Sequence, residues 1–147
     1  WEERDKLEVD AFHVARDLGL PMFGICRGAQ LLCALNGGSL WQNVSRHGVH
    51  HMIYDAGLEE MFSTSSCHHQ MCRPNPENTD ILGWAYKQTT IFQDDTTSIE
   101  SDGDFGTEPE LMYHKNINAL AVQGHPEWMP ADSGMVKWIQ NFMKEKM

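Results

Sequence analysis

The chain has 147 residues, a formal net charge of −10 and 41% apolar residues. This length predicts one domain over residues 1–147, and the apolar content predicts a globular fold rather than a disordered chain. The acidic balance argues against nucleic-acid binding, because a phosphate backbone requires clustered cationic side chains.

Cysteine use and the ends of the chain bear on the compartment. Cys26, Cys33, Cys67 and Cys72 form no C-x-x-C pair and no zinc-ligand spacing, so we expect free thiols, a reducing compartment and no metal or cofactor. The N-terminus is charged from its first residues, which is atypical of a signal peptide, and no apolar run reaches membrane-spanning length. These features predict a cytoplasmic protein with no membrane partner.

The first third of the chain predicts helix, strand, turn and helix. Residues 2–18 show helical periodicity, residues 22–25 form a short apolar run, and residues 27–36 form a second helical segment that ends at Asn36-Gly37-Gly38. The apolar stripe expected on the first helix consists of Leu7, Ala11, Val14, Ala15 and Leu18. This alternation favours an α/β fold with a parallel sheet.

The rest of the chain is less regular. We expect a loop with a short strand over residues 42–60, turns over 73–80, one or two strands over 81–92 and an acidic loop over 93–110. Residues 119–122 predict a strand. A last helix follows, which Asp132 is expected to cap; its expected apolar stripe is Met135, Val136, Ile139, Phe142 and Met143.

The segment Gly24-Ile25-Cys26-Arg27-Gly28 has the G-x-C-x-G pattern of a nucleophile elbow, placed between a predicted strand and a predicted helix. A sharp turn there exposes the thiol, and we expect both glycines to leave room for it. The helix N-terminus favours a thiolate, and the N–H of Arg27 is the expected oxyanion donor.

A catalytic thiol needs a base, and His125 is the best of eight histidines, since it follows the strand predicted at residues 119–122. Glu127 is two residues further on and is expected to orient the imidazole as the acid of a triad.

Four ordered motifs carry a family resemblance. They are Gly24-Ile25-Cys26-Arg27-Gly28-Ala29-Gln30, Gly37-Gly38-Ser39-Leu40, Ser66-Cys67-His68-His69-Gln70 and Gln123-Gly124-His125-Pro126-Glu127-Trp128. Together they resemble class I glutamine amidotransferases, most closely the γ-glutamyl hydrolase branch (peptidase family C26). The resemblance implies a flavodoxin-like, three-layer α/β/α fold with a mostly parallel sheet. Nothing matches the family's N-terminal strands or its glycine-rich loop, which carries a second oxyanion donor, so we expect the chain to lack them.

The resemblance also implies roles and a reaction. Cys26 is the implied nucleophile, His125 the base and Glu127 the orienting carboxylate; Gln30, Ser66, His68 and Gln70 are implied to contact the substrate. The implied substrate is a small molecule, glutamine or a γ-glutamyl compound, which reacts through a γ-glutamyl thioester. An amidotransferase would pass the ammonia to a separate synthase subunit.

Three alternatives remain open from the residues. The first is a catalytically inactive interaction or regulatory domain on the same scaffold. The second is a metal-binding protein that uses His47, His50 and His51, or His68 and His69. The third is a cysteine protease or other thiol hydrolase with the same triad and a different substrate.

Overall fold

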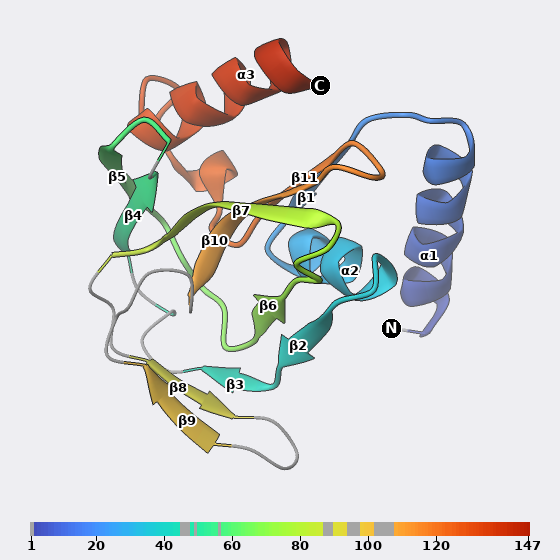
Figure 1. Ribbon diagram of the computed structural model, residues 1–147, viewed down its shortest axis with the longest axis horizontal. Helices are drawn as coiled ribbons and strands as arrows, with labels where there is room; N and C mark the ends of the chain where they lie inside the picture. The colour runs from blue at the N-terminus through green and yellow to red at the C-terminus, as the bar shows by residue number, and fades with distance from the viewer. Residues whose placement is uncertain are drawn as a thin grey trace.

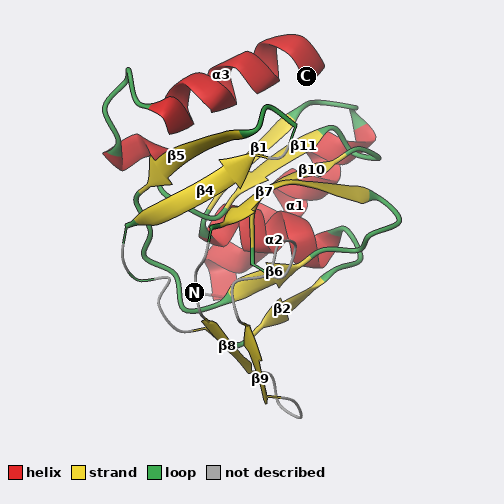
Figure 2. Cartoon of the chain, turned by 60° about the vertical axis from the view of Figure 1, so that its left-hand side comes forward, coloured by secondary structure: helices red, strands yellow, loops and turns green. Residues whose placement is uncertain are grey.

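The computed structural model describes residues 2–44, 48, 50–55, 57–86, 90–93, 98–101 and 108–147. In these ranges a central sheet lies between helices, α3 on one face and α1 and α2 on the other (Figures 1 and 2). The elements are α1 (Glu2–Asp17), β1 (Met22–Ile25), α2 (Arg27–Leu35), β2 (Ser39–Trp41), β3 (Asn43–Val44), β4 (His51–Asp55), β5 (Glu60–Thr64), β6 (Met71–Arg73), β7 (Thr79–Ala85), β8 (Thr90–Gln93), β9 (Ser98–Ser101), β10 (Pro109–His114), β11 (Ala119–Val122), the 3₁₀ turn η1 (Pro126–Trp128) and α3 (Gly134–Lys146). None of the described helices is long and apolar enough to cross a bilayer.

The central sheet has six strands in the order β1-β11-β10-β7-β4-β5. β1 and β11 are parallel, whereas every other described pair in this sheet is antiparallel. The expected α/β class and three layers are confirmed, but the sheet is mixed rather than mostly parallel. The reason is local: β4–β5 and β10–β11 are joined by connections of only a few residues, which permit antiparallel pairing but no parallel crossover.

Both faces of the sheet are buried, and β11 shows this most simply. Ala119 and Ala121 pack with Phe12 of α1 and Leu32 of α2, in one apolar cluster. Leu120 and Val122 belong to a second cluster, whose other members include Met135, Trp138 and Ile139 of α3. A strand covered on both faces reads as a continuous apolar run, which is why residues 119–122 were predictable as a buried strand.

The helices agree with expectation in position and differ in their contacts. Of the stripe expected on α1, Leu7, Val14 and Leu18 are exposed, and the buried residue of this helix is Phe12. α3 begins one residue later than expected, because the N-cap is Ser133, whose Oγ accepts from the N–H of Val136, rather than Asp132. Trp138 joins the buried face of α3.

The largest difference from expectation lies near residue 110. The acidic residues of 93–110 predicted a loop, but β9 occupies Ser98–Ser101 and β10 begins at Pro109. Glu108 and Glu110 are fully buried rather than solvated. The part of this acidic stretch at residues 94–97 and 102–107 lies outside the described residues. In the 42–60 segment, the one short strand expected is replaced by β3, β4 and the start of β5.

His114, at the end of β10, makes the unfolding free energy depend on pH. It is buried, its Nδ1 contacts Thr79 Oγ1 at 2.7 Å, and its Nε2 has no hydrogen-bond partner among the described residues. Burial lowers its pKa to about 4. A depressed pKa in the folded state makes this group's contribution to stability complete above about pH 6.5 and progressively lost as the pH falls towards 4.

We therefore expect acidification from pH 7 to 4 to lower the unfolding free energy by about 3 kcal/mol through His114 alone. Denaturant unfolding at pH 7, 5 and 4 measures this loss. In His114→Asn the amide can still donate to Thr79 but cannot titrate, so this variant should lose about 3 kcal/mol less than the wild type over the same range. Equal losses in the two proteins would contradict the assignment.

Candidate active site

The predicted elbow is present, with Cys26 at the junction between β1 and α2. Its backbone has φ 50° and ψ −104°, a strained conformation for a residue with a side chain. Its N–H donates to Val122 O at 2.8 Å, which ties it to the end of β11, and its carbonyl accepts from the N–H of Gln30 at 3.0 Å. Strain held by the ends of a strand and a helix is what a nucleophile elbow requires.

The two glycines of the elbow are not equivalent. A Cβ atom on Gly24 would lie 2.6 Å from the backbone C and O of Gly28 and 2.7 Å from Leu32, so β1 and α2 approach too closely for any side chain there. A Cβ on Gly28 would meet nothing within 4 Å among the described residues. The expectation that both glycines make room for the turn is therefore correct for Gly24 and wrong for Gly28.

His125 and Glu127 form a hydrogen-bonded pair just beyond β11. His125 Nδ1 lies 2.7 Å from Glu127 Oε1; because a carboxylate accepts, Nδ1 carries the hydrogen and Nε2 is left to act as a base. The backbone of His125 is anchored at both ends: its N–H donates to Ser65 O at 3.0 Å, and its carbonyl accepts from Ser65 Oγ at 2.6 Å. The ring of Trp128 stacks on the imidazole at a centroid distance of 3.8 Å and an angle of 10°.

The sheet brings the cysteine and the histidine to the same edge. β1 and β11 are parallel neighbours with Ile25 opposite Val122, so Cys26 follows one strand end and His125 the next. This is the carboxyl edge of the strands, where sites in α/β proteins form.

The environment of Cys26 disfavours ionisation of its thiol. Burial raises the pKa of the Cys26 thiol above its usual value, and nearby Cys67, Glu127 and Glu110 act in the same direction. The backbone N–H of Arg27 acts the other way and lowers this pKa. Since the surrounding groups disfavour a thiolate, ionisation of Cys26 requires a cationic partner, and an imidazolium at His125 would be one.

A cavity of about 240 Å³ opens beside Cys26. Its lining residues are Cys26, Arg27, Gln30, Cys67, His68, His69 and Gln70. Three of the four expected substrate residues therefore line it, whereas Ser66 is buried and is not among the lining residues. Cys67 and His69 were not named individually as substrate residues, but both lie inside the Ser66–Gln70 segment that was expected to border the site.

The side chain and the main chain of Arg27 have separate contacts. The guanidinium forms ion pairs with Asp5 and Glu8 of α1, so the side chain links the two helices. The main-chain N–H of Arg27 acts on the Cys26 thiol, as an oxyanion donor at that position would.

Two histidines of the alternative metal site, His51 and His68, have other partners. His51 contacts Glu110, and His68 Nδ1 contacts the carbonyl of Gln70; His47 lies outside the described residues. Within the described ranges, no group of three or more His, Cys, Asp or Glu side chains is arranged to hold a metal ion.

Comparisons with known proteins give a consistent result. The family model Glutamine amidotransferase class-I matches residues 3–145. Two relatives are the carbamoyl phosphate synthase small chains of Clostridium acetobutylicum (27% identical over 124 residues) and Photobacterium profundum (25% over 137 residues). The alignments cover 84% and 92% of this chain and 31% and 32% of the relatives, so the chain spans about a third of their length.

Among solved structures, a glutamine amidotransferase from Thermotoga maritima matches with a TM-score of 0.60 and 17% identity, covering 95% of this chain and 54% of that one. The TM-score shows that the two folds are alike, and at 17% identity the match shows the fold alone.

Proposed function

Because this chain belongs to the class I glutamine amidotransferase family, we propose that it hydrolyses the γ-amide of glutamine or of a γ-glutamyl compound, with Cys26, His125 and Glu127 as its triad. The observation that supports this most directly is the pairing of a strained cysteine at the end of β1 with a His–Glu hydrogen bond of 2.7 Å beyond the adjacent parallel strand. The backbone strain at Cys26 costs free energy, and the hydrogen bond to Glu127 fixes the tautomer of His125. Together they meet the requirements of a thiol nucleophile with an oriented base.

In the proposed reaction, His125 Nε2 takes the thiol proton, and the Cys26 sulfur attacks the γ-carbonyl carbon. The negative charge on the carbonyl oxygen is stabilised by the N–H of Arg27. The C–N bond then breaks as His125 returns the proton to the leaving ammonia or amine, which leaves a γ-glutamyl thioester. His125 next deprotonates water, the hydroxide attacks the thioester, and glutamate and the free thiol result.

The cavity beside Cys26 is the proposed site for the rest of the substrate. Gln30 Nε2 donates to the Gln70 carbonyl at 3.2 Å, which fixes the amide orientation and leaves the Gln30 amide oxygen as an acceptor. We assign Gln30, His68 and Gln70 to the wall that contacts the α-amino and α-carboxylate groups. Ser66, which is buried beneath this segment, is assigned to its support.

The fate of the ammonia is also a proposal. Two relatives are named as small chains of carbamoyl phosphate synthase, which favours ammonia donation to a separate synthase subunit. Hydrolysis of γ-glutamyl amines, the reaction of the branch that the motifs resemble, is the second candidate for the same site.

An inactive interaction domain is favoured by one observation, the raised pKa of the Cys26 thiol. Competitive labelling with iodoacetamide at pH 7 separates the two functions. If His125 ionises Cys26, the half-buried Cys26 should be labelled faster than the exposed Cys67, and His125→Asn should abolish that preference. Labelling of Cys26 slower than Cys67 in the wild type would favour the inactive domain.

The substrate is tested by a panel of glutamine, asparagine and γ-glutamyl amines, with released ammonia or amine measured directly. We expect turnover of the γ-glutamyl compounds and none of asparagine, whose carbonyl is one methylene too close to the α-carbon. Acid quenching followed by mass spectrometry should find the γ-glutamyl group on the peptide that contains Cys26. Turnover with acylation at another residue, or no turnover of any γ-glutamyl compound, would contradict the proposal.

A further inference from the structure

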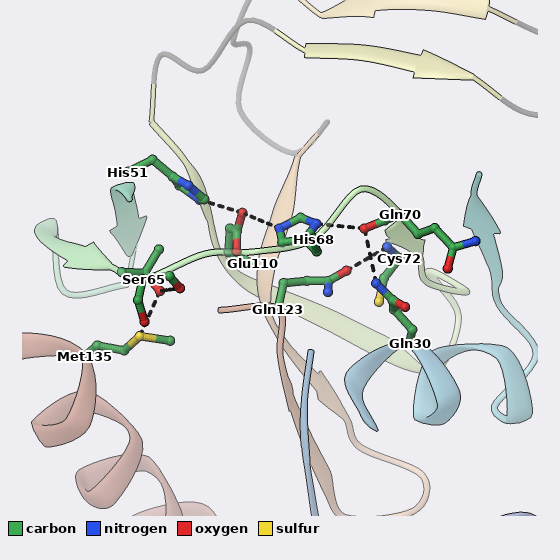
Figure 3. A network of polar contacts seen from close by, with 10 residues as sticks. Gln30, His51, Ser65, His68, Gln70, Cys72, Glu110, Gln123 and Met135 are labelled. Atoms are coloured by element: carbon green, nitrogen blue, oxygen red, sulfur yellow. Dashed lines mark hydrogen bonds and ion pairs between the residues drawn. The ribbon is translucent and has the colours of Figure 1, made fainter. Parts of the chain in front are cut away.

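A fully buried carboxylate connects two histidines next to the candidate site (Figure 3). Glu110, on β10, has Oε1 2.7 Å from Nε2 of His51 on β4 and 3.6 Å from Nε2 of His68 in the segment between β5 and β6. Both histidines are also buried. Burying a carboxylate costs free energy unless charged or hydrogen-bonding partners compensate it. Movement of either histidine away from Glu110 would lose that compensation, so the three side chains hold one another in place.

The far side of His68 continues to the cavity wall. His68 Nδ1 lies 2.7 Å from the carbonyl oxygen of Gln70, and the same oxygen accepts from Gln30 Nε2 at 3.2 Å. A carbonyl oxygen only accepts, so the hydrogen on this edge of the imidazole is on Nδ1. The second ring nitrogen, Nε2, is the one that faces Glu110, as Figure 3 shows. Because a carboxylate also only accepts, Nε2 pairs with Glu110 when it too carries a hydrogen, that is, when His68 is an imidazolium.

We propose that Glu110 is a positioning residue for the substrate wall: it holds His68 in one ring orientation and, through the Gln70 carbonyl, sets the side chain of Gln30. The inference rests on the proposed function for its catalytic consequence, but the positioning itself is a property of the free protein. His51 is the outer support, because it occupies the other side of the same carboxylate oxygen. The arrangement joins β10 and β4 of the central sheet to a segment that lines the cavity.

The charge on Glu110 predicts the direction in which Glu110→Gln changes the reactivity of the Cys26 thiol, and a general loss of structure does not predict that direction. Glu110 is among the groups that raise the pKa of the Cys26 thiol, after burial, Cys67 and Glu127. Replacing its carboxylate by an amide removes that negative charge and leaves the nucleophile as reactive as before or more so. If Glu110 is a positioning residue, Glu110→Gln should therefore weaken substrate binding without lowering the reactivity of the Cys26 thiol.

The test is Glu110→Gln, with glutamine hydrolysis and iodoacetamide labelling measured on the same preparation. We expect KM for glutamine to rise about tenfold, the effect of weakening one buried ion pair, with kcat changed by less than about threefold. The rate of Cys26 alkylation at pH 7 should not fall. In a double-mutant cycle with His68→Gln, the two KM effects should be far from additive, since one residue acts through the other.

His114→Asn is the matched control, because it changes another buried titratable residue of β10 that does not contact the cavity. A KM increase of equal size in this control, additive effects in the cycle, or slower alkylation in Glu110→Gln would each overturn the positioning role.

Histidine ¹⁵N spectra of the wild type test the same geometry without activity or a variant. His68 should show a hydrogen on both Nδ1 and Nε2, and Glu110→Gln should shift its ring resonances more than those of His114. A wild-type His68 that carries a hydrogen on only one ring nitrogen overturns the proposal. If the chain hydrolyses no γ-glutamyl compound but these spectra are as expected, the proposed function fails and the positioning by Glu110 stands.

Discussion

Cys26→Ala is expected to lower glutamine hydrolysis by at least about 10⁴-fold, to the level of residual catalysis by binding alone. The physical reason is that the alternative thiols cannot replace it. Cys33, on α2, and Cys72, on β6, are buried in one apolar cluster, and of the four cysteines only Cys26 combines the strained backbone with the N–H of Arg27 at its side chain. Initial rates of ammonia release at saturating glutamine measure the loss.

Cys67→Ala is the matched control, because Cys67 lines the same cavity and is more exposed than Cys26. It should keep kcat within about threefold of the wild type, since a cavity-wall contact contributes far less than a nucleophile. Activity that survives in Cys26→Ala and disappears in Cys67→Ala would identify Cys67 as the nucleophile and contradict the assignment of Cys26.

Gly24→Ala is expected to destabilise the fold by about 3 kcal/mol, at the upper end of the range for overpacked sites. The added Cβ would lie 2.6 Å from the backbone of Gly28, and backbone atoms at the start of α2 cannot move aside as the end of a flexible side chain can. Any relief must shift α2 away from β1 and so displace Cys26, so activity should fall together with stability. Thermal or urea unfolding measures the first effect, and ammonia release the second.

Gly28→Ala makes the same chemical change four residues later and should have the opposite sign. Its Cβ meets no described atom within 4 Å, and the position is inside α2, where alanine is favoured over glycine by up to about 1 kcal/mol. We expect a small stabilisation and near-normal activity. Equal destabilisation by the two substitutions would show that the approach of β1 and α2 is not what requires glycine at position 24.

Local patterns were sufficient for the elements that carry the proposed chemistry. The apolar run 22–25, the G-x-C-x-G turn and the helical spacing from Arg27 onward are contiguous in the chain, and β1, the strained Cys26 and α2 formed where these patterns predicted. The run 119–122 likewise became β11, because a strand buried on both faces is apolar at every position. The His125–Glu127 hydrogen bond joins residues two positions apart and was predictable for the same reason.

Long-range contacts decided the rest. An acidic segment is normally solvated, and nothing local distinguishes Glu110 from a surface residue; it is buried because His51 and His68, 59 and 42 positions away, meet it there. The antiparallel pairing of β10 with β7 and β11 and the cavity formed by α2 with residues 67–70 also depend on partners distant in the chain. Sequence by itself therefore determined the strands and the helix that present the proposed nucleophile and its proposed base, because each of them is a local pattern. Only the tertiary structure decided which polar residues are buried and which residues line the cavity beside Cys26, because burial is a property of neighbours that the chain brings together by folding.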